Sequence, residues 1–206
     1  MHKYYKKNEK KLLKDMRKML SPLKREIEQA TGEDADKIIN EAQKVYKEKY
    51  LEQMPYIGGK GNSGTGNLTG SCYFVALYDV SRNYGATAEE IGKIATMAMQ
   101  KMIERVPKFA RALIKKIMYT NFGQKILKKQ VAKRKAYAKD YPYSWDSEYR
   151  EPNEKYTHQL IAHRCGIEMF LRDKDTADFL PYLCNLDYAM FGTLILPLAR
   201  ENAIGL

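Results

Sequence analysis

Apolar residues recur every three or four positions through most of the first 140 residues, and this spacing restricts the chain to a mainly helical fold. The pattern runs through 4–29, resumes over 36–54 and returns over 88–102. It is interrupted at Ser21-Pro22, where two helices that meet and one kinked helix fit the residues equally well. The spacing therefore predicts a helical N-terminal arm over residues 1–54.

A glycine-rich segment, 55–67, follows the arm. Five glycines fall in the nine residues 58–66, a content usually kept where the backbone takes positive φ or approaches another group closely. The Gly-Lys-Ser/Thr ending of a phosphate-binding loop is absent. The glycine content predicts a flexible loop that could cover a ligand. A plain linker fits the same residues equally well. A helix over 71–82 is expected next, and a capping box at Thr87 and Glu90 begins another.

The net charge of +11 arises in one part of the chain. Residues 101–139 contain thirteen Lys or Arg against the single acid Glu104, which gives +12. Such a segment could follow nucleic-acid phosphates or an acidic membrane surface. Its apolar residues recur at helical spacing, however, so we interpret it as the basic, solvated outer face of core helices. We therefore expect no membrane partner, and nucleic acid is a disfavoured partner.

The helical pattern ends at 141–145. Residues 156–165 alternate like a strand, which would put His163 and Cys165 on one face and His158 on the other.

A further strand is predicted over 193–204. The expected fold class is α+β, with the helical N-terminal two-thirds packed on a small, mainly antiparallel C-terminal sheet. We expect residues 55–206 to form this α+β domain and the arm to join it in one compact unit.

The three cysteines, at positions 72, 165 and 184, are odd in number and form no short-spaced pair. This argues against a disulfide framework and against a Cys-x-x-Cys zinc site. The N-terminus lacks the apolar core of a signal peptide, and no stretch approaches the ~20 apolar residues of a membrane span. We expect reduced thiols, a cytoplasmic location and no cofactor.

Several short motifs occur in an order that resembles one known family. They are Pro-Tyr-Ile-Gly-Gly at 55–59 with Asn67, the helix start at 84–91, Arg164-Cys165, and Pro-Tyr-Leu-Cys-Asn-Leu-Asp at 181–187. In these motifs the chain resembles the L-2-amino-thiazoline-4-carboxylic acid hydrolase family, from about residue 54 to residue 204. The resemblance implies a bacterial enzyme that opens a thiazoline ring with water and gives N-carbamoyl-L-cysteine. Similar proteins continue into a Cys-Asp-Phe ending that this sequence lacks, so either the chain is truncated or its site differs.

The candidate catalytic groups lie between His158 and Asp187, a segment with two of the three cysteines and two of the three histidines. Opening a thiazoline ring needs a nucleophile, a base and an acid. We assign Cys184 as nucleophile or thiol ligand, and helical spacing would put Asp187 on its face. His163 is the expected base, or the cation that lowers a thiol's pKa, with Cys165 beside it.

A second set of residues is assigned to substrate binding. Arg164 or Arg200 could grip a substrate carboxylate through two parallel hydrogen bonds. The resemblance implies that Gly58, Gly59 and Asn67 cover the same site from the other half of the chain.

Three other interpretations stay open. Both thiols could be core residues, since cysteine is among the most buried residue types. Zinc bound by Cys165, Cys184 and His163 is a weaker alternative, because their spacing fits no known closed set. The leading hypothesis is thus a small-molecule hydrolase of cyclic amidines without a metal. Its alternative is a non-catalytic ligand-binding or regulatory domain, and a homo-oligomer is compatible with both.

Overall fold

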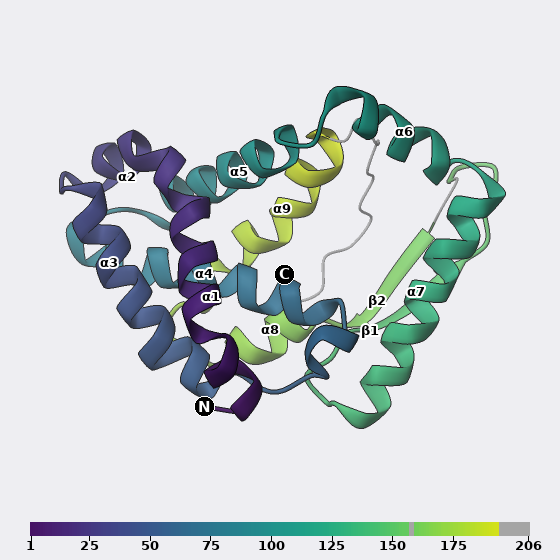
Figure 1. The fold of residues 1–206 in the computed structure, drawn as a ribbon, viewed down its shortest axis with the longest axis horizontal. Helices are drawn as coiled ribbons and strands as arrows, with labels where there is room; N and C mark the ends of the chain where they lie inside the picture. The colour runs from purple at the N-terminus through teal and green to yellow at the C-terminus, as the bar shows by residue number, and fades with distance from the viewer. Residues whose placement is uncertain (157–158, 194–206) are drawn as a thin grey trace.

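The computed structural model describes residues 1–156 and 159–193. Within them, helices precede a two-stranded ribbon, and two more helices follow it (Figure 1). The α-helices are α1 Lys3–Leu20, α2 Lys24–Thr31, α3 Ala35–Val45, α4 Gly64–Ser81, α5 Ala88–Glu104, α6 Lys108–Met118, α7 Asn121–Asp140, α8 Gly166–Leu171 and α9 Leu180–Thr193. The strands are β1 Asp146–Arg150 and β2 Gln159–Arg164. Short 3₁₀ turns occupy Ser21–Leu23, Gly59–Gly61, Arg82–Tyr84 and Ala177–Phe179, and Tyr46–Leu51 is π-helical.

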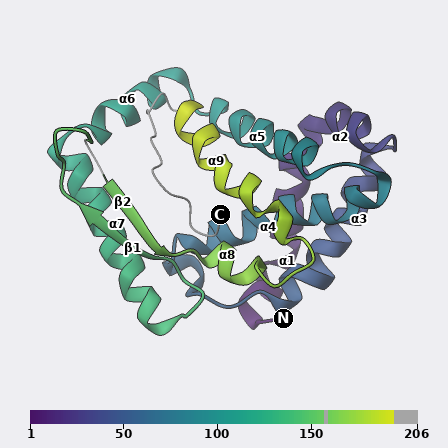
Figure 2. The ribbon, with the colours of Figure 1, turned by 180° about the vertical axis from the view of Figure 1, so that it is seen from behind.

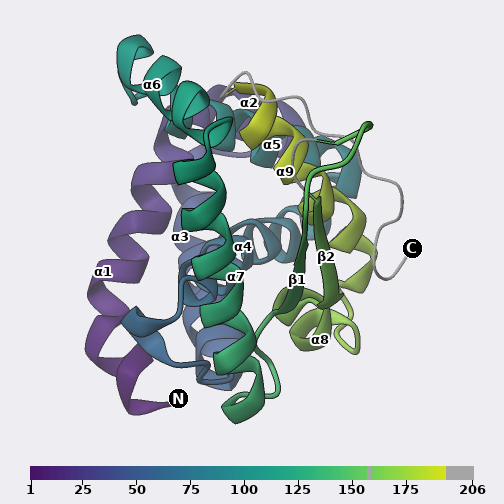
Figure 3. The ribbon, with the colours of Figure 1, turned by 90° about the vertical axis from the view of Figure 1, so that its right-hand side faces the viewer.

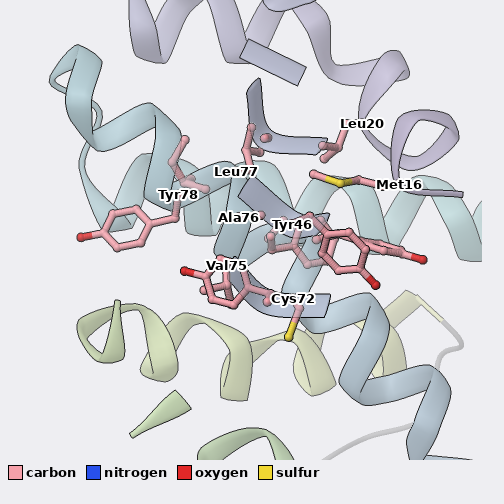
Figure 4. Close-up of a cluster of buried hydrophobic side chains, with 14 of the residues drawn as sticks. Met16, Leu20, Tyr46, Cys72, Val75, Ala76, Leu77 and Tyr78 are labelled. Carbon is pink, nitrogen blue, oxygen red and sulfur yellow. The ribbon is translucent and has the colours of Figure 1, made fainter. Parts of the chain in front are cut away.

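The centre of the fold is α4, with α1 on one side and α8 and α9 on the other (Figure 3). Every residue from Cys72 to Ser81 is buried. A helix that is apolar on all sides is stable only when other elements cover all of them. Figure 4 shows how side chains of α1, Tyr46 and α4 pack together, with the buried Cys72 at the margin of the drawn group. One buried cluster includes residues of both the N-terminal arm and the following domain.

The junction of α1 and α2 is a 3₁₀ turn that contains Pro22. Proline is tolerated there because the first positions of a helical turn need no backbone donor. Ser21 does not cap α2, since its hydroxyl donates to the carbonyl oxygen of Arg17 at 2.7 Å. The capping box predicted at the start of α5 is confirmed, because Thr87 and Glu90 bond to each other's backbone amides.

A network of charged groups joins the end of α4 to the segment before Ala177–Phe179. The buried carboxylate of Asp79 accepts hydrogen bonds from Lys49 at 2.8 Å, Arg82 at 2.7 Å and the hydroxyl of Tyr50 at 3.0 Å. Asp175 binds the same two cations at 2.9 Å and 2.6 Å. These hydrogen bonds lower the pKa of the Asp175 carboxyl to about 2.

The strands β1 and β2 pair antiparallel, with Ser147 opposite Ala162 and Arg150 opposite Gln159. The helices and this small C-terminal sheet confirm the α+β fold class. The strand predicted over 156–165 is confirmed for Gln159–Arg164, whereas Cys165 already belongs to the start of α8. Of the strand predicted over 193–204, Thr193 ends α9 and the remainder lies outside the described residues.

The glycine-rich segment is more helical than predicted, because α4 begins at Gly64 and not near residue 71. Its glycines permit close contact with aromatic rings from distant parts of the chain. A Cβ atom on Gly58 would lie 2.6 Å from the ring of Tyr137, and one on Gly64 would lie 2.5 Å from the ring of Trp145. Gly58 also has a φ of 107°. The segment is therefore a packed junction.

The basic segment differs from the prediction. No residue of α6 is buried, and only Gly123 and Val131 are buried in α7. The two helices lie along one edge of the molecule (Figure 1). They are therefore not core helices with a solvated outer face, since most of their apolar side chains are not covered. No helix in the described part of the chain has the length and apolar content needed to cross a bilayer.

Candidate active site

Cys165 is the N-cap residue of α8, in extended conformation with φ −110° and ψ 119°. Burial raises the pKa of its thiol, and the nearby carboxylates of Glu168 and Asp187 act in the same direction. The backbone amides of Ile167 and Glu168 oppose this change but do not reverse it. Cys165 is therefore a neutral thiol near pH 7, and it is not an activated nucleophile.

Asp187 and Cys184 both lie on α9, three residues apart, so the predicted helical relation between them is confirmed. Asp187 is exposed and Cys184 is half-buried. The main contact of α9 is with α5 (Figure 2). There Gly92 faces Tyr182, and a Cβ atom on the glycine would lie 2.8 Å from Cγ of the ring. This close approach fixes the position of α9 against α5.

Arg134 of α7 forms a cluster with Cys165 and Asp187, and sequence reasoning missed it. Its Nε donates to Oγ of Ser63, just before α4, at 3.3 Å. Burial lowers the pKa of its guanidinium, while the negative charge of Asp187 acts in the opposite direction. Among thirteen cations in one segment, nothing in the sequence distinguishes Arg134 from the others. Only the packing of α7 brings it toward Asp187.

The junction beside Ser63 is held by the buried Asn62. Its side-chain amide donates to the carbonyl oxygen of Ile57 at 2.6 Å and to Oγ of Ser144 at 2.8 Å. Its oxygen accepts from the backbone amide of Gly64 at 2.9 Å. The first turn of α4 is thereby tied to the segment that enters β1.

The three residues assigned to cover the site occupy different environments. Gly58 and Gly59 both have positive φ and pack against Tyr137 and Tyr4, respectively, which gives them a structural reason to be glycine. Asn67 lies in the first turns of α4, where it is exposed.

Two other predicted residues have partners away from this cluster. His163 is exposed on β2, where its Nε2 lies 3.1 Å from Glu148 of β1. The Nε of Arg164 donates to the carbonyl oxygen of Ser144 at 3.0 Å, and an Nη atom donates to that of Ala138 at 2.7 Å. Arg164 therefore holds the end of α7 against β2, and Cys165, which caps α8, comes directly after the strand that carries His163.

His158 and Arg200 lie outside the described residues. In the described part of the chain, no three His, Cys, Asp or Glu side chains converge as metal ligands. Cys72, Cys165 and Cys184 form no disulfide.

A cleft of about 620 Å³ borders the glycine-rich junction. It is formed by α1, the first half of α4 and the end of α5, and both Asn62 and Ser63 line it. Its charged lining consists of Lys11, Lys18, Lys60, Lys101, Arg105 and Asp15. The cleft is therefore suited to an anion, whereas Cys165, Asp187 and Arg134 are not among its lining residues.

Four segments thus form the candidate active site: Ser63 before α4, Arg134 of α7, Cys165 before α8 and Asp187 of α9. The arrangement offers a carboxylate, a guanidinium and a neutral thiol. Comparison with known protein families, with curated proteins and with solved structures finds no match for this chain.

Proposed function

We propose that the protein is a hydrolase that opens a small cyclic amidine carrying a carboxylate, such as 2-amino-thiazoline-4-carboxylate. One feature of the fold carries the proposal: Asp187 lies within electrostatic range of both Arg134 and Cys165, although the three residues belong to different helices or helix ends. The motif resemblance in Pro181–Asp187 and around Cys165 supports the same class of substrate.

Arg134 binds the substrate carboxylate through its Nη groups, because Nε is already engaged by Ser63. Asp187 acts as a general base and takes one proton from a water molecule, whose oxygen bonds to the ring carbon between nitrogen and sulfur. The carbon–sulfur bond then breaks with its electron pair on sulfur, and Asp187 returns the proton to that sulfur. The second proton of water ends on the imine nitrogen. The product is an open-chain ureido acid with a free thiol, and no oxidant or reductant is consumed.

Water is the proposed nucleophile because burial keeps Cys165 in its neutral form. A neutral thiol can still donate a hydrogen bond to a nitrogen of the ring. We therefore expect Cys165→Ser to retain most of the activity. Cys184, one turn from Asp187 on α9, is the competing nucleophile, and Cys184→Ser tests it directly.

The experiment incubates the purified protein with 2-amino-thiazoline-4-carboxylate and measures the ureido product by mass spectrometry, so that the protein's own thiols do not interfere. We expect Asp187→Asn to lower kcat by about 10²–10⁴. Arg134→Gln should mainly raise KM. The matched control is Asp173→Asn, an exposed carboxylate outside the cluster, which should leave both constants unchanged. Full activity of Asp187→Asn, or inactivity of Cys184→Ser alone, would show that the proposed roles are wrong.

A non-catalytic ligand-binding protein is the second candidate, and the cationic cleft beside α1 favours it. Five cations against one acid would attract a small carboxylate or phosphate compound. Thermal unfolding with the thiazoline acid and with inorganic phosphate measures such binding. A raised Tm that is lost in Lys18→Gln and Lys60→Gln, without any ureido product, would support binding in the cleft over catalysis.

A further inference from the structure

Large apolar side chains are exposed along α6 and the beginning of α7. Phe109 is 76% exposed, Phe122 is 65% exposed and Leu113 is 56% exposed. Ile114, Tyr119 and Ile126 are also exposed. A single exposed apolar residue is ordinary, but six large ones lie here within eighteen residues, and exposed apolar patches usually mark interaction sites.

Helical spacing collects the three of these residues that belong to α6 on one side of that helix. Phe109 and Leu113 are four residues apart and lie on the same face, and Ile114 extends it by about 100° around the helix. Lys108 and Lys115 fall on the remaining arc, whereas Lys116, seven residues after Phe109, borders the apolar face. Exposed apolar residues also occur at the start of α7, which only Tyr119 and Thr120 separate from α6; there Phe122 and Ile126 are four residues apart on one face. Figure 3 shows α6 at one extremity of the molecule, above α7. We call Phe109, Leu113, Ile114, Phe122 and Ile126 the exposed apolar face.

The surroundings of this face are strongly cationic, with +12 between residues 101 and 139. In the described part of the chain, Lys128 pairs with Glu151 at 2.6 Å. Within the same residues, Lys108, Lys115, Lys116 and Lys125 form no ion pair with a carboxylate. Their charges are therefore available to an external anionic surface.

We propose that α6 and the first half of α7 bind the surface of a bilayer that contains anionic lipids. The exposed apolar face enters the boundary between headgroups and acyl chains, and the flanking lysines contact the anionic headgroups. Binding of this kind lies in the plane of the interface, so it needs no membrane-spanning helix. The inference is independent of the proposed hydrolase activity.

Charge and apolar exposure together favour a bilayer over other occupants. A second copy of this chain would bring two segments of +12 against each other, and like charges in contact oppose association. Nucleic acid would satisfy the lysines but would leave Phe109 and Leu113 in water. An anionic bilayer satisfies both features.

The experiment measures co-sedimentation of the full chain with vesicles of phosphatidylcholine alone and of phosphatidylcholine with about 30% phosphatidylserine. We expect binding to the anionic vesicles that weakens as salt is raised. The variant Phe109→Ser/Leu113→Ser should bind at least about tenfold more weakly, because it removes two large inserted side chains. Since no residue of α6 is buried, the fold should persist, and circular dichroism checks this.

Two matched controls make the test specific. Leu160→Ser removes a comparably exposed leucine, 50% exposed, from β2 and should bind like the wild type. Lys115→Glu/Lys116→Glu should lose binding, whereas Lys6→Glu/Lys7→Glu on the exposed side of α1 should not.

Three outcomes would overturn the proposal. The first is no binding to anionic vesicles at low salt. The second is equal binding by the wild type and by Phe109→Ser/Leu113→Ser, which would indicate a purely electrostatic attraction. The third is a dimer in solution that the same double variant dissociates, which would assign the face to a second copy.

Discussion

Replacing Gly92 by alanine tests how closely α9 is positioned against α5. The added Cβ atom would lie 2.8 Å from Cγ and 3.0 Å from Cβ of Tyr182. Ordinary carbon contacts are about 3.5–4.0 Å, so one helix must move by roughly 0.5–1 Å. Because Cβ and Cγ of Tyr182 are close to its backbone, they cannot rotate away from the new methyl group as the end of a flexible side chain could. Overpacking of this kind costs about 1–3 kcal/mol.

Alanine also has a higher helix propensity than glycine, worth about 1 kcal/mol in a helix interior. Gly70, inside α4, is the matched control, because a Cβ atom there would meet nothing within 4 Å. Gly70→Ala should stabilise the protein by about 1 kcal/mol, whereas Gly92→Ala should be neutral or destabilising by up to about 2 kcal/mol. The difference between the two variants is then about 1–3 kcal/mol and does not depend on propensity.

Thermal unfolding followed by circular dichroism measures this difference. At about 2–4 °C per kcal/mol for a chain of this size, the two Tm values should be separated by roughly 2–12 °C. In the double variant Gly92→Ala/Tyr182→Ala the two changes should couple favourably, because the smaller side chain gives the new methyl group room. If Gly92→Ala is as stable as Gly70→Ala, the close contact that positions Asp187 and Cys184 on α9 does not exist.

Three other outcomes follow from the same structure. The pKa of Asp175 is lowered to about 2, so its contribution to the free energy of unfolding is complete above about pH 4 and is lost as the pH falls toward 2. Asp175→Asn should therefore make the free energy of unfolding less dependent on pH between about pH 4 and about pH 2. An unchanged pH dependence would contradict the ion-pair network. Removing the N-cap of α5 with Thr87→Ala should cost about 0.5–2 kcal/mol in urea unfolding, while Thr87→Ser should cost much less; equal losses would rule out the cap. Burial raises the pKa of both Cys72 and Cys165, and Cys72 is fully enclosed. An alkylating reagent should therefore modify Cys72 only on unfolding and Cys165 slowly at pH 7, as measured by mass spectrometry. Rapid labelling of Cys165 would refute the neutral-thiol assignment.

The local sequence pattern was sufficient to predict the helices that are stabilised mainly by interactions within a few residues. The capping box at Thr87 and the helical spacing of the arm predicted α5 and α1 to α3, because hydrogen bonds within one turn and one apolar face define such helices. The relation between Cys184 and Asp187 followed from spacing alone for the same reason. The start of α4 was missed because glycine is unfavourable in isolated helices, and only contact with Trp145 accounts for Gly64 there.

The exposed apolar face is a feature that the sequence pattern could not predict. The spacing of Phe109 and Leu113 predicted an amphipathic helix, and α6 is one. Spacing shows that a helix has an apolar side but not whether another element covers it. The composition predicts no membrane partner, whereas the exposure of this side favours one at the bilayer surface.

The amino-acid sequence by itself determined that the protein is a mainly helical α+β chain with one strongly basic segment. Only the tertiary structure decided which groups meet. Arg134 donates a hydrogen bond to Ser63, and the charge of Asp187 acts on its pKa, whereas His163 pairs with Glu148 on the two-stranded ribbon. Periodicity fixes the direction of a side chain only relative to its own helix or strand, while the packing of glycines against rings fixes the helices relative to one another. The chemistry of the candidate site therefore depends on long-range packing that no local pattern contains.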